Sequence, residues 1–512
     1  MAAQDQAGAL PLDLEPACLK GRQLALAGLA LALANFVVVL DITIANVSVP
    51  HISGSLAVAP TQGTWVITSY SVAEAICVPL SGWLAARFGA VRVFLTAILG
   101  FALFSLLCGL SRSLEALIVF RIFQGLSGGP IMPMSQTLMV RIFPKEKQGM
   151  ALGLWSMTVV VAPILGPIFG GTISDNLSWH WIFFINLPVV AFCTFFAMRY
   201  VRRFETPTVR RPIDYVGLAL LVIWVGALQI MLDEGRNSDW FASSFICSLA
   251  VIAVIGFAAF LIWELTEANP VVDLSVFASR GYSVAVAVQS ISYAAFFSGI
   301  VVIPLFLQTN LGYTATYAGY ATAFVGVLAV LMSPVAAGMM ARYDVRRLIT
   351  FGVLWLGAMS LLRTDWVSQM DFFTISLPQL LQGLGMPFFF IGTTSLALGS
   401  VRADQTASAA GLQNFVRTLA GAFATSLSTT MWEHEAKLAH EDLAGLVRPL
   451  PAGTGLTVEQ GRMALERLVQ TESVTLATNT VFWGCAALFA VAAALVWLAP
   501  RPRGGIDLSA AH

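Results

Sequence analysis

The sequence predicts an all-α polytopic membrane protein with fourteen transmembrane helices. Hydrophobic residues make up 57% of its 512 residues and charged residues only 11%, and the mean hydropathy is +0.79. A soluble domain holds roughly 25% charged residues. The apolar residues also gather in runs of roughly 20, the length of helix that crosses a hydrocarbon core about 30 Å thick. A water-soluble fold could not bury this much apolar surface.

The runs form a group of six, a central pair and a second group of six. We expect an N-terminal bundle over 1–201, a linker and central helix pair over 202–281, and a C-terminal bundle over 282–512. One long polar segment, 432–473, precedes the last run and is expected to form an external loop. Within it, 432–441 and 458–470 are helix-compatible, and Pro449, Pro451, Gly453 and Gly455 break the chain between them. The runs lie near 23–45, 62–84, 92–111, 114–137, 149–172, 181–201, 214–233, 244–265, 282–308, 316–340, 347–364, 374–398, 405–430 and 475–498.

The distribution of Lys and Arg predicts the orientation, because short cytoplasmic loops hold the excess of positive charge. If the chain starts inside, the short outer loops hold only Arg112, Arg236 and Arg363. Both termini should then be cytoplasmic. No small-residue cleavage site follows the first apolar run, so we expect that run to remain as a helix. The inner loops and ends collect Lys20, Arg22, Arg87, Arg92, Arg141, Lys145, Lys147, Arg199, Arg202, Arg203, Arg210, Arg211, Arg280, Arg342, Arg346, Arg347, Arg402, Arg501 and Arg503.

The remaining composition argues against several classes of function. Lys plus Arg and Asp plus Glu are equal at 28 each, so nothing suggests a nucleic acid partner. The six cysteines are scattered without metal-ligand spacing. No nucleotide-binding glycine loop and no nucleophile–base pattern is present. We therefore expect no cofactor, no metal site and no enzymatic activity.

A glycine-rich basic loop joins the second and third spans. It reads Gly82-Trp-Leu-Ala-Ala-Arg-Phe-Gly-Ala-Val-Arg92, with Arg87 and Gly89 inside it. It resembles the signature loop of the major facilitator superfamily, except that Ala86 replaces the usual acidic residue. An ordinary basic turn is the alternative. A weaker copy eight spans later fits two six-helix bundles related by duplication, which transport by rocking. The copy consists of Pro334, Gly338, Arg342, Asp344 and Arg346.

Two charged residues stand inside apolar spans and are the candidates for proton coupling. Asp41 lies in Leu40-Asp-Ile-Thr-Ile-Ala-Asn-Val-Ser-Val-Pro50, which resembles the motif of fourteen-helix drug:proton antiporters. A carboxylate in the membrane costs roughly 2.5–3.5 kcal/mol, so it is usually paired, protonated or facing a cavity. Arg121, in the family's Arg-x-x-Gln-Gly pattern, is the partner we expect. The alternative is a structural aspartate satisfied by hydroxyls such as that of Thr43.

Two further embedded charges have open roles. Glu74, in the second span, is either a second proton carrier or a structural acid. Arg417, in the thirteenth span, either takes part in coupling or pairs the two bundles.

The fifth span contains Ala162-Pro-Ile-Leu-Gly-Pro-Ile-Phe-Gly-Gly171, which resembles the antiporter motif of exporters in this superfamily. Gly166 and Gly170 form a smooth stripe for close packing, while Pro163 and Pro167 bend the helix. Together with Gly171 we expect this seam to act as a gate. As a lone pattern such a stripe is common in membrane helices. The run from Trp179 to Pro188, at the start of the sixth span, is interpreted as an interfacial anchor.

Together the motifs resemble the EmrB type of multidrug:proton antiporter, in the fourteen-helix branch of the superfamily. Segments such as 62–68, 154–158, 228–233 and 417–421 carry the likeness across the membrane part. The resemblance implies proton-coupled efflux of lipophilic drugs or other small amphipathic toxic compounds by alternating access. It further implies a Gram-negative inner membrane and a tripartite system with a periplasmic membrane-fusion adaptor of the EmrA type and an outer-membrane channel of the TolC type. A proton-coupled uptake permease, or an exporter of one metabolite or fatty acid, remains the alternative.

Overall fold

A computed structural model describes residues 19–144, 147–209, 212–340, 342–446 and 457–500, and within these ranges the regular structure is helical. The first group of helices runs from residue 21 to residue 204. It comprises α1 (Gly21–Ser55), α2 (Pro60–Gly63), α3 (Trp65–Cys77), α4 (Ser81–Phe88), α5 (Ala90–Leu110), α6 (Leu114–Gly128), α7 (Ile131–Ile142), α8 (Gln148–Asn176), α9 (Trp181–Phe184) and α10 (Asn186–Phe196), which continues through short π and 3₁₀ turns to Phe204.

A central pair and a second group of helices follow. The pair is α11 (Tyr215–Glu234) and α12 (Ser244–Thr266). The second group comprises α13 (Arg280–Thr309), α14 (Ala315–Met340), α15 (Val345–Leu361), α16 (Phe372–Gly399), α17 (Thr406–Leu446) and α18 (Val458–Leu495).

Each of the fourteen expected spans coincides with one helix or with consecutive helical segments. Among the described residues, nine helices are long and apolar enough to cross a membrane, and the bent α8 makes a tenth. The other four expected spans do not meet this length and hydropathy test, for local reasons. Two of them are interrupted, one into α3 and α4 and the other into α6 and α7. Helix α15 has only 17 residues, and α17 is strongly polar in its second half. The predicted fold class, a polytopic all-α membrane protein, is confirmed.

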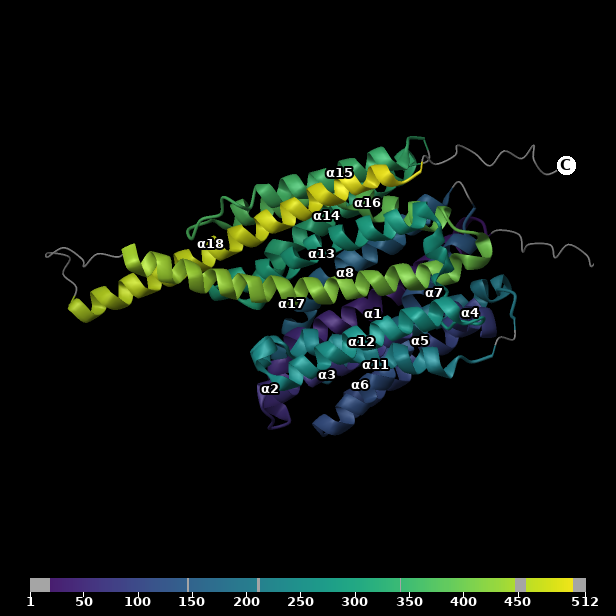
Figure 1. Ribbon diagram of the computed structural model, residues 1–512, viewed down its shortest axis with the longest axis horizontal. Helices are drawn as coiled ribbons and strands as arrows, with labels where there is room; N and C mark the ends of the chain where they lie inside the picture. The colour runs from purple at the N-terminus through teal and green to yellow at the C-terminus, as the bar shows by residue number, and fades with distance from the viewer. Residues whose placement is uncertain (1–18, 145–146, 210–211, 341, 447–456, 501–512) are drawn as a thin grey trace, which may run out of the picture.

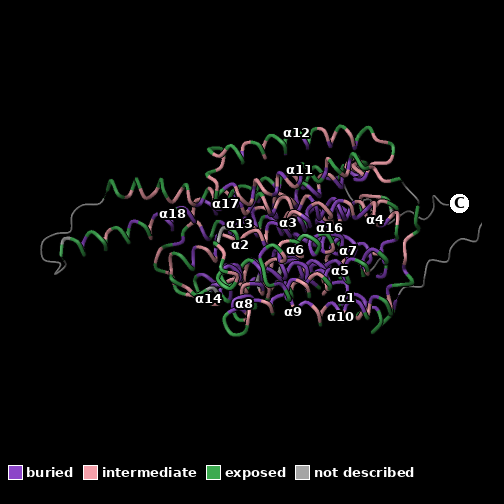
Figure 2. The backbone as a smooth tube through the Cα atoms, turned by 90° about the horizontal axis from the view of Figure 1, so that it is seen from below, coloured by how far each residue is buried: buried purple, intermediate pink, exposed green. Residues whose placement is uncertain are grey.

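The two groups of helices form two bundles that meet along a long interface (Figure 1). In the view of Figure 1, α13 to α18 lie in the upper part and α1, α3, α5 and α6 in the lower part. Helix α8 packs against α14 and α16 of the second group, and α17 packs against α4 and α7 of the first. Helix α11 contacts both α3 and α17, and α12 lies outside α11 at the edge of the molecule (Figure 2).

Helices α1 and α8 form a tight seam in the first bundle. A Cβ atom added to Gly166 would lie 2.2 Å from Oγ1 of Thr43, and one added to Gly170 would lie 3.0 Å from the carbonyl oxygen of Ile44. Helix α8 bends by 44° between its segments Gln148–Pro163 and Leu165–Asn176, and it also contains Pro167. The small residues let the two backbones approach. Gly171, one residue further along, faces Thr316 of α14 in the other bundle.

The signature loop is held by a carboxylate from a distant segment. Glu205, after the sixth span, accepts hydrogen bonds from the backbone N–H groups of Val91 (2.8 Å) and Arg92 (3.1 Å) at the start of α5. A negative group at a helix N-terminus satisfies its free donors and its dipole. Gly89 has φ +92°, and a Cβ there would lie 2.5 Å from the Glu205 carboxyl group. Glu205 therefore supplies the carboxylate that the loop lacks at Ala86.

The other signature residues lie around this cap. Gly82 packs directly on Ser408 of α17, since a Cβ there would lie 2.6 Å from the Ser408 Cα atom. The guanidinium carbon of Arg87 lies 5.4 Å from the centre of the Trp83 ring. The loop thus joins the first bundle to α17 of the second.

The weaker copy of this loop carries its own cap. Asp344 accepts a hydrogen bond from the backbone N–H of Arg346 (3.0 Å) at the start of α15 and a second from its Nη2 (2.8 Å). Hydrogen bonding by the Arg346 side chain holds the pKa of the Asp344 carboxyl below its ordinary value. Arg346 also donates to the carbonyl of Ala499 (3.2 Å) after α18. The corresponding helices α5 and α15 are therefore both capped by a carboxylate. The cap of α5 comes from the distant Glu205, whereas the cap of α15 comes from the adjacent Asp344.

The expected external loop 432–473 is largely helical. Helix α17 continues without a break to Leu446, and α18 begins at Val458. The 41 residues of α17 span about 60 Å at 1.5 Å per residue, twice the hydrocarbon thickness. Both helices project from the bundle as a hairpin (Figure 1). The chain breakers Pro449, Pro451, Gly453 and Gly455 lie outside the described residues.

Arg363 lies in the turn after α15, the loop position that the charge map predicted, but its side chain points inward and is only 1% exposed. Its Nη2 donates to the side-chain oxygens of Gln379 (3.2 Å) and Gln382 on α16. Two amide oxygens on the next helix stabilise this guanidinium, an arrangement that loop position alone does not reveal.

We predict that Glu205→Ala loosens the signature loop, because removing a helix cap costs about 1 kcal/mol. Cleavage by trypsin after the exposed Arg92 should become faster in the detergent-purified protein. Asp365→Ala is the control, since Asp365 is an exposed carboxylate that caps no helix in the described structure. Equal cleavage rates in both variants and the wild type would contradict this role.

We also predict that Gly166→Ala destabilises the α1–α8 seam, because overpacking costs about 1–3 kcal/mol. The measurement is the midpoint of thermal unfolding in detergent. Gly484→Ala in α18 serves as the matched control, because a Cβ at Gly484 meets nothing within 4 Å. A shift of the same size in both variants would show that the seam tolerates the added methyl group.

Candidate functional site

The most deeply buried ion pair joins Asp41 on α1 to Arg121 on α6. Nη1 of Arg121 donates to Oδ2 of Asp41. The Arg121 side chain is 0% exposed and the Asp41 side chain is 1% exposed. Asp41 lies in the middle of a 35-residue apolar helix, where no water is available to satisfy it. The predicted partnership of these two residues matches the geometry.

Two amides complete the coordination of the carboxylate. Nε2 of Gln124 donates to Oδ1 of Asp41 at 3.0 Å, and Nδ2 of Asn186 donates to the same oxygen at 2.7 Å. Asn186 also donates to Oγ of Ser105 on α5 at 3.0 Å. Donors from α6 and α10 therefore surround one carboxylate.

Arg121 is fixed on its other sides. Its Nε donates to the carbonyl oxygen of Val66 at 3.0 Å, and Nη1 donates to Oε1 of Gln124 at 3.0 Å. The guanidinium carbon lies 4.1 Å from the centre of the Tyr70 ring. Gly125 allows this approach, because a Cβ there would lie 2.4 Å from the carbonyl oxygen of Tyr70. The arginine thus links α1, α3 and α6.

This arrangement can exchange a proton only if it opens. A proton on Asp41 neutralises the counter-ion of Arg121, and leaving a buried cation unpaired costs about 3–5 kcal/mol. Uptake of a proton at Asp41 therefore favours a rearrangement in which Arg121 finds another acceptor. A proton on Asp41 would therefore weaken the contact between α1 and α6.

Glu74 and Arg417 lie outside this cluster. Glu74, on α3, is 3% exposed, and its Oε1 has no hydrogen-bond partner. Arg417, on α17 of the second bundle, is also 3% exposed. The two side chains lie within Coulombic range of each other, yet they form no ion pair within 4 Å in the described part of the chain.

Sequence reasoning missed Asn186, Tyr70 and Glu205. Asn186 belongs to the run whose residues Trp179, His180 and Trp181 were interpreted as interfacial anchors, but its own side chain reaches inward to Asp41. The anchor interpretation was wrong for Trp179, which is buried, whereas Trp181 is exposed. The available signal was an asparagine in an apolar run, which needs a polar partner as much as an aspartate does.

The described residues contain no group of three His, Cys, Asp or Glu side chains that could hold a metal ion.

Comparison with known proteins places these features in a family. The model of the Major Facilitator Superfamily matches residues 31–425. The chain is 44% identical over 497 residues to the multidrug export protein EmrB of Escherichia coli K12, covering 95% of this chain and 97% of that protein. It is 42% identical over 501 residues to the fatty acid resistance protein FarB of Neisseria gonorrhoeae, covering 96% and 98%.

Solved structures agree on the fold. The proton:xylose symporter XylE superposes with a TM-score of 0.59 over 94% of this chain and 97% of that one, at 14% identity. At this identity the likeness concerns the fold alone. The family model and the extended identity together show that this chain belongs to the major facilitator superfamily, within the EmrB type of transporter.

Proposed function

We propose that this chain exports lipophilic drugs or other small amphipathic toxic compounds across a membrane in exchange for protons. The observation that carries the proposal is the ion pair of Asp41 and Arg121, an ionisable acid buried at mid-membrane and held by a cation on another helix. The names of the two relatives support the substrate class, since one is a multidrug export protein and the other a fatty acid resistance protein.

Proton binding and release at Asp41 drive the cycle in this proposal. The deprotonated carboxylate holds α1, α6 and α10 together through Arg121, Gln124 and Asn186. Protonation weakens these charge-assisted bonds, each worth about 1.5–3 kcal/mol. The released Arg121 then favours a different packing of α1 against α6. Alternation between the two packings couples the proton gradient to the movement of substrate.

The moving parts are the two bundles, 1–201 and 282–512, with 202–281 as the connection. They rock against each other along α8 and α14 on one side and along α4 and α17 on the other. The seam of α1 and α8, with Gly166, Gly170 and the bend at Pro163, limits leakage through the first bundle. Pro167 and Gly171 extend this seam toward α14.

The setting we propose is the inner membrane of a Gram-negative cell, with both termini in the cytoplasm. The arginines of the two signature loops then face the cytoplasm, as the positive-inside rule requires. The hairpin of α17 and α18 projects from the opposite end, into the periplasm. Its position suits contact with a membrane-fusion adaptor of the EmrA type, which leads to an outer-membrane channel of the TolC type.

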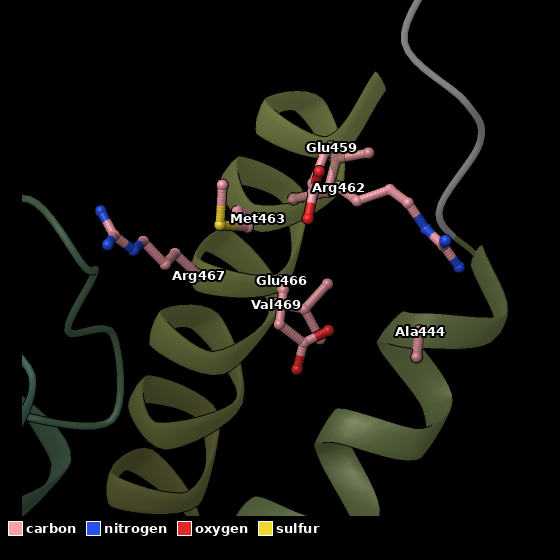
Figure 3. Close-up of a pocket in the computed structure, with 8 residues that line it drawn as sticks. Ala444, Glu459, Arg462, Met463, Glu466, Arg467 and Val469 are labelled. Atoms are coloured by element: carbon pink, nitrogen blue, oxygen red, sulfur yellow. The ribbon is translucent and has the colours of Figure 1, made fainter. Parts of the chain in front are cut away.

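The hairpin has features of a contact surface. Nε2 of His440 on α17 lies 3.5 Å from Oε1 of Glu466 on α18, which ties the two helices together. A pocket of about 630 Å³ lies near the tip, lined by Ala444 on one helix and by residues such as Glu459 and Met463 on the other (Figure 3). Within the described residues 432–446 and 457–473 of the hairpin, four large apolar side chains are more than one third exposed. They are Leu438, Leu446, Met463 and Leu468.

Asp41→Asn should abolish proton-driven export while the protein stays folded, because asparagine keeps the shape of the side chain but cannot bind and release the proton. The measurement is drug uptake into inverted proteoliposomes under a pH gradient. Asp175→Asn is the control, since Asp175 is a carboxylate 61% exposed at the end of α8. Arg121→Lys should keep part of the activity that Arg121→Met loses. Normal gradient-driven export by Asp41→Asn would refute the proposed coupling.

Replacing 438–467 by a short glycine-serine linker should leave proton-coupled transport in liposomes intact. It should weaken both capture of the adaptor and drug resistance in cells, because the projecting surface is gone. A second variant keeps the hairpin and changes the four exposed apolar residues to serine. If adaptor capture and resistance survive in both variants, the adaptor docks elsewhere, on the outer helix ends or the central pair.

A further inference from the structure

Arg417 is the least satisfied buried cation in the described structure. Four arginines are buried there, and three of them have oxygen acceptors: Arg121, Arg346 and Arg363. Nη2 of Arg417 contacts only the sulfur of Met132 at 3.2 Å, and its Nη1 has no partner. A thioether is a weak acceptor. The guanidinium thus has donor capacity that the protein itself leaves unused.

Aromatic rings flank this guanidinium on two helices. Its central carbon lies 5.5 Å from the centre of the Trp155 ring on α8 and 5.7 Å from the centre of the Tyr293 ring on α13. The Tyr293 ring packs in turn against Phe296, Phe297 and Phe390. Rings beside a cation stabilise it weakly and offer flat apolar surface to a bound molecule.

The position of Arg417 is at the interface of the bundles. Met132 and Trp155 belong to the first bundle, whereas Tyr293 and Arg417 belong to the second. The neighbouring Asn414 crosses the same interface, donating to Oε1 of Gln136 at 2.6 Å. Any rocking motion that separates the bundles uncovers this guanidinium together with its rings.

We propose that Arg417 anchors the acidic group of an anionic, lipophilic substrate, with Trp155 and Tyr293 packing against its apolar part. A carboxylate or sulfonate oxygen would supply the acceptor that Arg417 lacks, in a charge-assisted hydrogen bond. The proposal deepens the proposed function and rests on it: the chain exports small amphipathic compounds, and this site selects for negative charge among them.

The test compares two probes on the full-length protein in nanodiscs. Pyrenebutyrate carries a carboxylate, and its methyl ester has the same rings without the charge. Energy transfer from tryptophan to pyrene reports binding of both. Arg417→Gln should weaken pyrenebutyrate binding about tenfold or more, the size of one charge-assisted hydrogen bond, and leave ester binding unchanged. Arg417→Lys should fall between the wild type and Arg417→Gln in its binding of pyrenebutyrate.

The controls separate a binding role from a structural one. Arg402→Gln removes an exposed arginine from the connection between α16 and α17, where it pairs with Asp404, and should alter neither probe. Retained ester binding shows that an Arg417 variant is folded. Equal loss of both probes would make Arg417 a packing residue of the interface and overturn the proposal. Unchanged pyrenebutyrate binding in Arg417→Gln would overturn it as well.

Transport measurements on the same preparations keep the two proposals apart. If charge-selective binding at Arg417 persists but no proton-coupled export is found in liposomes, the proposed function fails and the binding site stands. If Asp41-dependent export is normal while Arg417→Gln binds the carboxylate as the wild type does, the binding site fails and the function stands.

Discussion

The burial of one ion pair in an apolar bundle constrains much of the first half of this protein. Asp41 and Arg121 are both at most 2% exposed, and removing either would leave the other as an unpaired charge in hydrocarbon. The structure avoids that cost by bringing Gln124, Asn186 and the carbonyl of Val66 to the pair. Four helices are thereby placed, because each must deliver its group within hydrogen-bond distance.

The second bundle repeats the close helix packing of this site, but without the buried carboxylate. Arg121-x-x-Gln124-Gly125 on α6 corresponds to Gln379-x-x-Gln382-Gly383 on α16. A Cβ at Gly383 would lie 2.2 Å from the carbonyl of Val325, much as one at Gly125 would meet the carbonyl of Tyr70 at 2.4 Å. Amide side chains there stabilise Arg363 without a carboxylate. Among the described residues, a fully buried carboxylate paired with an arginine therefore occurs in the first bundle.

The sequence predicted well what depends on local composition. The spans follow from apolar runs, and Asp41 and Arg121 were recognised because charges in such runs are costly. It predicted poorly what depends on contacts across long separations. Glu205 caps a helix that starts 115 residues earlier, at Ala90, and Asn186 reaches Asp41 across 145 positions. The polar segment after Trp432 was expected to hold two short helical stretches within an external loop. In the structure these stretches continue the two neighbouring spans as α17 and α18, because polarity alone does not end a helix.

Helix α3 connects the two buried charge systems physically. The carbonyl of Val66, the ring of Tyr70 and the carboxyl of Glu74 are four residues apart and share one face of the helix. The first two contact Arg121, and the third lies within Coulombic range of Arg417. Gly125 and Gly129 press directly on the same stretch of α3, so the helix has no room to absorb a shift. In the proposed cycle, a movement of Arg121 on protonation of Asp41 would therefore displace α3, the helix that carries Glu74.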